Sequence, residues 1–173
     1  SDEFAPDCDF GTLKARLISE LMQNNEGFFF SEGLKERLGG ENGFATFLDH
    51  GLEQAQRELG IPNGASLSQN KRRAIVFHFL NKTLVENLVD IVEATTYNNT
   101  CKDDIDRGGM ANAYLYAMMY RPAADASAAE LEKFAQNLEA IAFAPAMIVK
   151  KRGVVPHRFH DLTNALKQLK LWN

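Results

Sequence analysis

The chain of 173 residues has 45% hydrophobic and 24% charged residues, a composition typical of a folded globular protein and not of a disordered or membrane-spanning one. Its formal net charge of −4 argues against broad nucleic-acid binding, because that function needs a basic field to displace counterions from phosphates. Two cysteines are too few for a disulfide scaffold or a zinc cluster, and we expect no metal and no cofactor.

The N-terminus lacks the basic and apolar regions of a secretory signal, and no apolar run reaches the length of a membrane-spanning helix. We therefore expect a soluble protein. Residues 1–10 are interpreted as an N-terminal extension, and residues 11–173 as a single helical domain.

Apolar residues recur at helical spacing in three early stretches, which predict helices over residues 13–22, 31–38 and 44–59. A surface loop rich in turn-forming residues follows over residues 62–70. A long helix from about Asn70 to Val92 then has an almost continuous apolar face, which predicts a central position in the fold. His78 lies near this face, and we interpret it as a hydrogen-bonded core histidine rather than a ligand.

The second half of the chain predicts three more helices. One begins at Gly108 or Gly109 and ends before Arg121, one opens with the capping-box pattern of Ser127 and Glu130, and the last covers about residues 161–171. Residues 142–156 are interpreted as extended or irregular, with one or two short strands near 143–155. The predicted fold class is mainly α, a bundle of about six to seven helices.

The strongest functional pattern is the segment 101–110, Cys-Lys-Asp-Asp-Ile-Asp-Arg-Gly-Gly-Met. Five residues between Cys101 and Arg107 let the backbone curl so that its amide N–H groups point inward, as in an anion-binding nest. A helix that starts where this loop closes favours both a bound phosphate and an ionised Cys101. Arg107 adds a two-pronged donor for phosphate oxygens. The pattern therefore predicts a phosphate loop with Cys101 as its nucleophile.

This loop resembles that of the secreted bacterial effector phosphatases of the Cys-x5-Arg class, which act on phosphoinositides and inositol polyphosphates. Their loop commonly reads Cys-Lys-Ser-Gly-Lys-Asp-Arg-Thr-Gly-Met, and the resemblance is confined to this loop and the start of the helix. The matching positions are Cys101, Lys102, Asp106, Arg107, Gly109 and Met110, whereas Asp103, Asp104, Ile105 and Gly108 depart from the pattern.

The resemblance implies a phosphatase that acts on a phosphorylated inositol or lipid head group through a cysteinyl-phosphate intermediate. Cys101 would be the nucleophile, Arg107 the phosphate clamp and Lys102 a head-group contact. It also implies an effector that works in a host cytosol or at a membrane surface.

The remaining loop positions are expected to line the substrate with their backbone. Asp103 and Asp104 fit this role if their carboxylates point outward, since carboxylates aimed inward would repel the phosphate. Ile105 replaces a lysine, and Asp106 is expected to orient the loop through hydrogen bonds. Candidates for the general acid that protonates the leaving oxygen are Asp90, Asp125, Asp161, His157 and His160.

An alternative is a non-catalytic helical module or secreted effector that binds a partner protein through an apolar groove near residues 28–30 or 118–119. Cys101 would then be structural and could be disulfide-bonded to Cys8. This reading is favoured by residues 95–100, because they form a poor buried strand and phosphate loops of this type usually follow one. The oligomeric state stays open.

The basic run Lys150, Lys151 and Arg152 is a candidate for peripheral contact with a membrane. The alternative for this run is a solvated charged segment without a partner.

Overall fold

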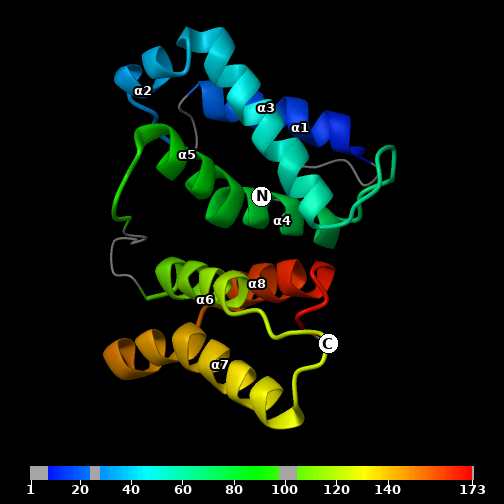
Figure 1. Ribbon diagram of the computed structural model, residues 1–173, viewed down its shortest axis with the longest axis vertical. Helices are drawn as coiled ribbons and strands as arrows, with labels where there is room; N and C mark the ends of the chain where they lie inside the picture. The colour runs from blue at the N-terminus through cyan, green and yellow to red at the C-terminus, as the bar shows by residue number, and fades with distance from the viewer. Residues whose placement is uncertain (1–7, 24–27, 98–104, 173) are drawn as a thin grey trace. The chain divides into compact units, whose positions relative to one another are not determined.

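Figure 1 shows the computed structural model, which describes residues 8–23, 28–97 and 105–172. Within these ranges the secondary structure is helical, with one isolated β-bridge between Asp9 and Ser66 and no strand. The predicted mainly α class is confirmed. The chain divides between Asn87 and Leu88 into two compact units. The two units differ in where their contacts lie, which does not test whether each folds independently. The expectation of a single domain over residues 11–173 therefore stays a prediction.

Unit 1 contains α1 (Phe10–Met22), α2 (Glu32–Arg37), α3 (Gly40–Glu58), α4 (Gln69–His78), the π-helical turn η1 (Phe79–Thr83) and the start of α5 (Leu84–Val92). Helix α3 packs against α1, α2, α4 and η1 and is the centre of the unit. Its inward stripe, Phe44, Leu48, Leu52 and Ala55, is fully buried. Each such large side chain stabilises the fold by roughly 1.5–3 kcal/mol through burial.

Polar side chains fix where these helices begin. The carboxylate of Asp9 accepts a hydrogen bond from the Thr12 amide at 2.7 Å, so α1 begins at Phe10, inside the extension expected over residues 1–10. Cys8 and Phe10 are buried, and the Leu67 amide donates to the Cys8 carbonyl. Residues 8–10 therefore belong to the folded part of unit 1. The thiol of Cys8 is free, and Cys101, its partner in the alternative disulfide, lies outside the described residues.

The helix expected from Asn70 to Val92 is present as α4, η1 and α5 in succession. Apolar periodicity predicted its length but not the widening of one turn at Phe79–Thr83. A π-turn inserts one residue into the i to i+4 pattern, and such turns are frequent at functional sites.

Unit 2 contains the end of α5, α6 (Arg107–Met119), α7 (Ala128–Lys150) and α8 (Pro156–Gln168). Helix α6 packs against both α7 and α8 (Figure 1). The reciprocal hydrogen bonds of Ser127 and Glu130 start α7, as the capping-box pattern predicted.

The short strands expected near residues 143–155 are wrong, because α7 continues through Pro145 to Lys150. Proline removes one helical hydrogen bond, but Ala142 and Ala146 on either side of it are buried, and this packing keeps the helix together. Helix α8 also begins earlier than expected, at Pro156, since the fixed backbone angle of proline suits the first helical position.

Gly43, in the first turn of α3, packs closely against the backbone of the turn that precedes this helix. A Cβ atom at this position would lie 1.8 Å from the Leu38 carbonyl oxygen, which is backbone and cannot move aside. We expect Gly43→Ala to lower the free energy of unfolding by about 2 kcal/mol or more, measured by denaturant titration. Gly33→Ala is the control, since Gly33 is in α2 with nothing within 4 Å of its Cβ position. It should be neutral or stabilising by up to about 1 kcal/mol.

Candidate functional site

Of the predicted phosphate loop, residues 101–107, the structure describes the part from Ile105 onward. Cys101, Lys102, Asp103 and Asp104 lie outside the described residues. The side chain of Ile105 is 3% exposed, so it is anchored in the core of unit 2. Ile105 can therefore face a ligand only through its backbone.

Helix α6 begins at Arg107, one or two residues before the start predicted at Gly108 or Gly109. Gly108, Gly109 and Met110 are buried in its first turn, whereas Arg107 is exposed. Asp106, the residue before the helix, makes no side-chain cap, and its carbonyl accepts the first helical hydrogen bond from the Met110 amide at 3.1 Å. The amides of Arg107, Gly108 and Gly109 thus precede the first helical donor, at the end of a helix where anions are favoured.

The carboxylate of Asp106 points to the turn between α7 and α8 instead. Its two oxygens pair with the Arg152 guanidinium at 2.6 and 3.0 Å, and Oδ1 also accepts from the Val155 amide at 3.3 Å. Arg152, followed by the Val155 amide, holds the pKa of Asp106 below its usual value of 3.8. This contact joins the start of α6 to the start of α8, because Val155 is the residue that precedes α8. The role expected for Asp106 in orienting the loop of residues 101–107 stays a prediction.

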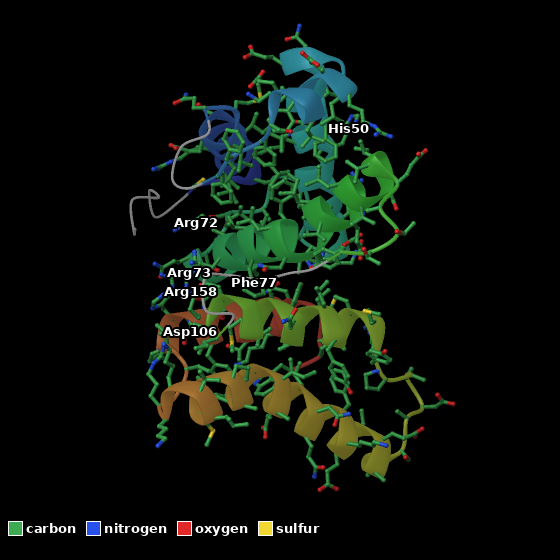
Figure 2. The ribbon with its side chains drawn as sticks, turned by 90° about the vertical axis from the view of Figure 1, so that its left-hand side faces the viewer. His50, Arg72, Arg73, Phe77, Asp106 and Arg158 are labelled. Atoms are coloured by element: carbon green, nitrogen blue, oxygen red, sulfur yellow. The ribbon has the colours of Figure 1, made fainter. Side chains whose placement is uncertain are left out.

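Basic side chains collect at this end of unit 2. Arg158, in the first turn of α8, interacts electrostatically with Asp106 and lies beside it in Figure 2. Between Glu139 and Asp161 the sequence contains no acidic residue. The end of the unit at which α6 and α8 begin therefore carries a local positive charge within an acidic chain, as an anion site requires.

The candidates for the general acid are separated by the fold. His157 lies in the first turn of α8, two residues after Val155, and His160 and Asp161 follow it on the same helix. Asp125 lines a pocket with Tyr116 and Tyr120, at the other end of α6. A helix rises 1.5 Å per residue, so Asp125 is roughly 15–20 Å from the loop and cannot protonate a group bound there. Asp90 is exposed on α5.

A shallow apolar groove runs from the first turn of α6 to the end of α7. Gly109, Asn112, Ile141, Pro145, Ile148 and Val149 line it. The helices approach closely here, since a Cβ atom at Gly109 would lie 3.5 Å from the Ala142 carbonyl oxygen and 3.7 Å from that of Ile141.

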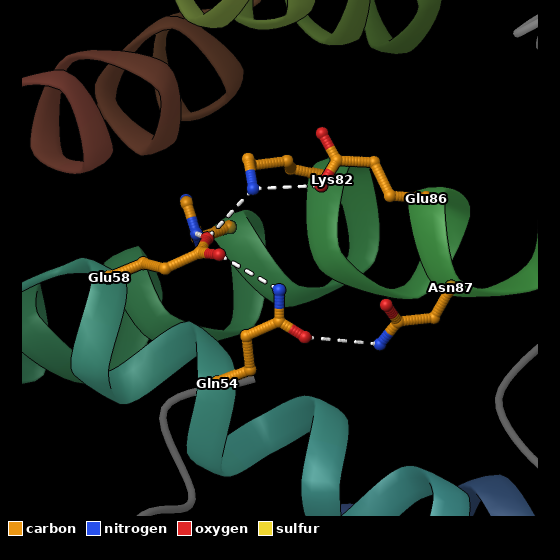
Figure 3. Close-up of polar contacts among 6 residues, drawn as sticks. Gln54, Glu58, Lys82, Glu86 and Asn87 are labelled. Carbon is orange, nitrogen blue, oxygen red and sulfur yellow. Dashed lines mark hydrogen bonds and ion pairs between the residues drawn. The ribbon is translucent and has the colours of Figure 1, made fainter. Parts of the chain in front are cut away.

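Unit 1 contains a separate polar cluster at the π-turn (Figure 3). Glu58 Oε2 lies 2.6 Å from His78 Nε2 and 2.9 Å from Lys82 Nζ, and the same ammonium group lies 2.8 Å from Glu86. Asn87 donates to Gln54 at 3.3 Å. His78 is only 1% exposed, so its interpretation as a hydrogen-bonded core histidine is confirmed.

The cluster shifts the protonation of its members. Burial lowers the pKa of His78 below 6.5 and outweighs the opposite effect of Glu58. Burial would raise the pKa of Glu58, but hydrogen bonds from Gln54, Lys82 and His78 outweigh it and hold that pKa at about 2. The sequence did not point to this cluster, because Glu58 and Lys82 are 24 positions apart and ordinary surface residues by pattern.

Within the described ranges, no three histidine, cysteine or carboxylate side chains are grouped so that they could hold a metal ion. None of the helices described there combines the length and the apolar character needed to cross a bilayer.

Comparison of the chain with protein-family models, curated proteins and solved structures finds no match. No residue role is therefore carried over from a relative.

The His78 cluster predicts how stability depends on pH. His78 binds its proton more weakly in the folded chain, so its contribution is fully present above about pH 6.5 and is lost as the pH falls through 6.5 toward the lower folded pKa. The contribution of Glu58 to the free energy of unfolding is fully present above pH 4.5 and is lost as the pH falls to and through about 2. We expect His78→Gln to reduce the loss of unfolding free energy between pH 7 and pH 5, where one proton changes it by at most about 1.4 kcal/mol per pH unit.

His50→Gln is the matched control, because His50 is an exposed histidine on α3 (Figure 2). The free energy of unfolding of His50→Gln, measured by denaturant titration at each pH, should depend on pH as that of the wild type does. If the free energy of unfolding falls equally between pH 7 and pH 5 in the wild type and in His78→Gln, a neutral, buried His78 is contradicted.

Proposed function

We propose that this chain is a phosphatase that removes phosphate from phosphorylated inositols or phosphoinositide head groups through a cysteinyl-phosphate at Cys101. The observation that supports it best is that α6 begins at Arg107 without a cap from the Asp106 side chain, whose carboxylate is held by Arg152 and Val155 instead. A loop of this sequence needs both conditions in order to accept a phosphate dianion.

The charge distribution supports the same proposal. A carboxylate next to Arg107 would repel phosphate if it were turned toward the amides, and the pairing with Arg152 neutralises it. The amides at the start of α6 present the positive end of the helix dipole. Arg107 is exposed and supplies the charged donor, and Arg158 adds a cation for a second phosphate group on the same ring.

The proposed reaction has two steps. The Cys101 thiolate attacks phosphorus, an S–P bond forms, and the P–O bond to the inositol oxygen breaks as that oxygen takes a proton from a general acid. Water then attacks the cysteinyl-phosphate and transfers a proton to the conjugate base of that acid. Inorganic phosphate leaves and the thiolate is restored. His157 is best placed to be the acid, because it follows Val155 at the end of the unit where α6 begins.

Replacement of the nucleophile tests this function. We expect Cys101→Ser to abolish phosphate release from inositol polyphosphates and short-chain phosphoinositides, because a serine hydroxyl is not ionised under these conditions. Cys8→Ala is the control, since Cys8 is a buried free thiol of unit 1, and it should retain turnover. Undiminished phosphate release by Cys101→Ser would rule the proposal out.

The reactivity of the thiol gives an independent measurement. As the nucleophile of the proposed phosphate loop, Cys101 should be alkylated well below about pH 8, and inorganic phosphate should protect it. Cys8 donates its thiol hydrogen to the Asp9 carbonyl and is buried, so it should react only on unfolding. Mass spectrometry measures the alkylation rates of Cys101 and Cys8 in one sample. A Cys101 as inert as Cys8 would contradict an activated nucleophile.

A helical protein-binding module is the second candidate function. It is supported by exposed apolar side chains at the two places where the sequence suggested a groove, since Phe29 is 80% and Met119 is 73% exposed. Phe30, in contrast, is buried against Phe44 with ring centroids 4.8 Å apart. An inert Cys101 together with intact folding would favour this module over the phosphatase.

A further inference from the structure

The last turn of α7 exposes three consecutive large apolar side chains. Met147, Ile148 and Val149 are 60%, 77% and 64% exposed, and we call them the apolar tip. Successive helical residues are rotated by about 100°, so the three side chains cover roughly 200° of the helix circumference. A groove on a partner protein takes one face of a helix, whereas a surrounding apolar medium accepts side chains that point in several directions.

The apolar tip extends beyond the packed part of unit 2. Helices α6 and α7 are antiparallel, since Tyr116 stacks on Phe134 with ring centroids 5.7 Å apart while Gly109 lies against Ala142. Arg107, the first residue of α6, is therefore level with about residue 144 of α7. The turn after Pro145 therefore lies level with or beyond the start of α6, and Ile148 and Val149 share a groove with Gly109 and Asn112 of that helix.

Basic residues follow the apolar tip immediately. Lys150 and Lys151 are exposed at the end of α7. Lys151 ends the helix with a φ of 52°, in the left-handed region where glycine is favoured, so a lysine occupies this place at a conformational cost. Residues 140–160 contain Lys150, Lys151, Arg152 and Arg158 and no acidic residue. The charge of this segment is complementary to an anionic surface.

The turn that carries these residues is fixed to the rest of unit 2. The Arg152 amide donates to the Ala146 carbonyl at 3.4 Å, and its guanidinium binds Asp106 and the Gly153 carbonyl. Little conformational entropy is therefore lost when the tip binds a surface. The groove lined by Ile148 and Val149 also reaches Gly109, so the tip lies near the start of α6.

We propose that the apolar tip and Lys150 and Lys151 form a docking surface for an anionic lipid bilayer. The three apolar side chains enter the interfacial region, and the two ammonium groups bind the acidic head groups. This proposal does not depend on turnover at Cys101. If both hold, docking brings the start of α6 close to lipid head groups.

The test is co-sedimentation of the intact chain with vesicles of phosphatidylcholine, with or without phosphatidylserine. We expect binding to the anionic vesicles that weakens as salt is raised, because the lysine contribution is screened. Each basic residue near such a surface contributes about fivefold in affinity, so Lys150→Glu with Lys151→Glu should weaken binding more than about tenfold. Met147→Ser, Ile148→Ser and Val149→Ser together should weaken it to a similar degree.

Matched controls lie near the other end of α7. Lys133→Glu makes the charge change of one of the two tip substitutions at an exposed position of the same helix, and Leu131→Ser removes a side chain that is 48% exposed. Both should bind anionic vesicles as the wild type does. All the replaced side chains are exposed, so thermal unfolding should be unchanged.

The proposal is overturned if the chain does not bind anionic vesicles, or if the controls lose as much binding as the tip variants. It is also overturned if the tip instead mediates self-association, seen as a dimer by light scattering that the triple serine variant dissociates without any vesicle binding. Cys101→Ser should still bind vesicles, so a failure of the phosphatase proposal and a failure of membrane docking give different results.

Discussion

The contact of Asp106 with Arg152 and the Val155 amide is the constraint on which the described part of the candidate site depends. It ties the residue before α6 to the turn that precedes α8, so the two helix starts lie at one end of unit 2. It also keeps a carboxylate from the amides of the first turn of α6. Without it, the negative charge nearest to Arg107 would compete with any bound phosphate.

The two units carry different kinds of polar interaction. In unit 1, His78, Lys82 and Glu58 are partly or fully buried and satisfy one another, which positions α3 against α4 and the π-turn. In unit 2 Asp106 and Arg152 pair beside the start of α6, and the Arg152 side chain is 44% exposed. Buried, mutually satisfied charges contribute to a defined packing, whereas exposed charges next to free donors are suited to bind a solute.

The end of α7 shows how one helix can serve two purposes. Its inward residues, Ala142 and Ala146, pack in unit 2, and Gly109 allows the close approach of α6. Its last turn continues past α6 and carries apolar side chains followed by lysines. A helix that had ended at Pro145 would have had no such turn. The tolerance of α7 for an internal proline therefore creates the surface that we assign to lipid.

Local chemistry in the sequence determined most helix positions. The side chains of Asp9, Ser31, Ser68 and Ser127 accept hydrogen bonds from amides three residues later, and the apolar spacing of α3 gave its buried stripe. The start of α6 near Arg107 followed from the loop pattern and the glycines. These features depend on residues within one or two turns of each other, and sequence reasoning handles such distances well.

Only the tertiary structure decided which distant groups meet. Asp106 and Arg152 are 46 positions apart and Glu58 and His78 are 20 apart, so no local pattern could pair them. Residues 142–156 are extended or irregular by local pattern, whereas α7 continues through Pro145, because the burial of Ala142 and Ala146 outweighs the hydrogen bond that proline removes. The sequence by itself determined that a helix starts close to Arg107. The fold decided that the neighbouring carboxylate is neutralised there, because the arginine that pairs with it arrives from the end of α7.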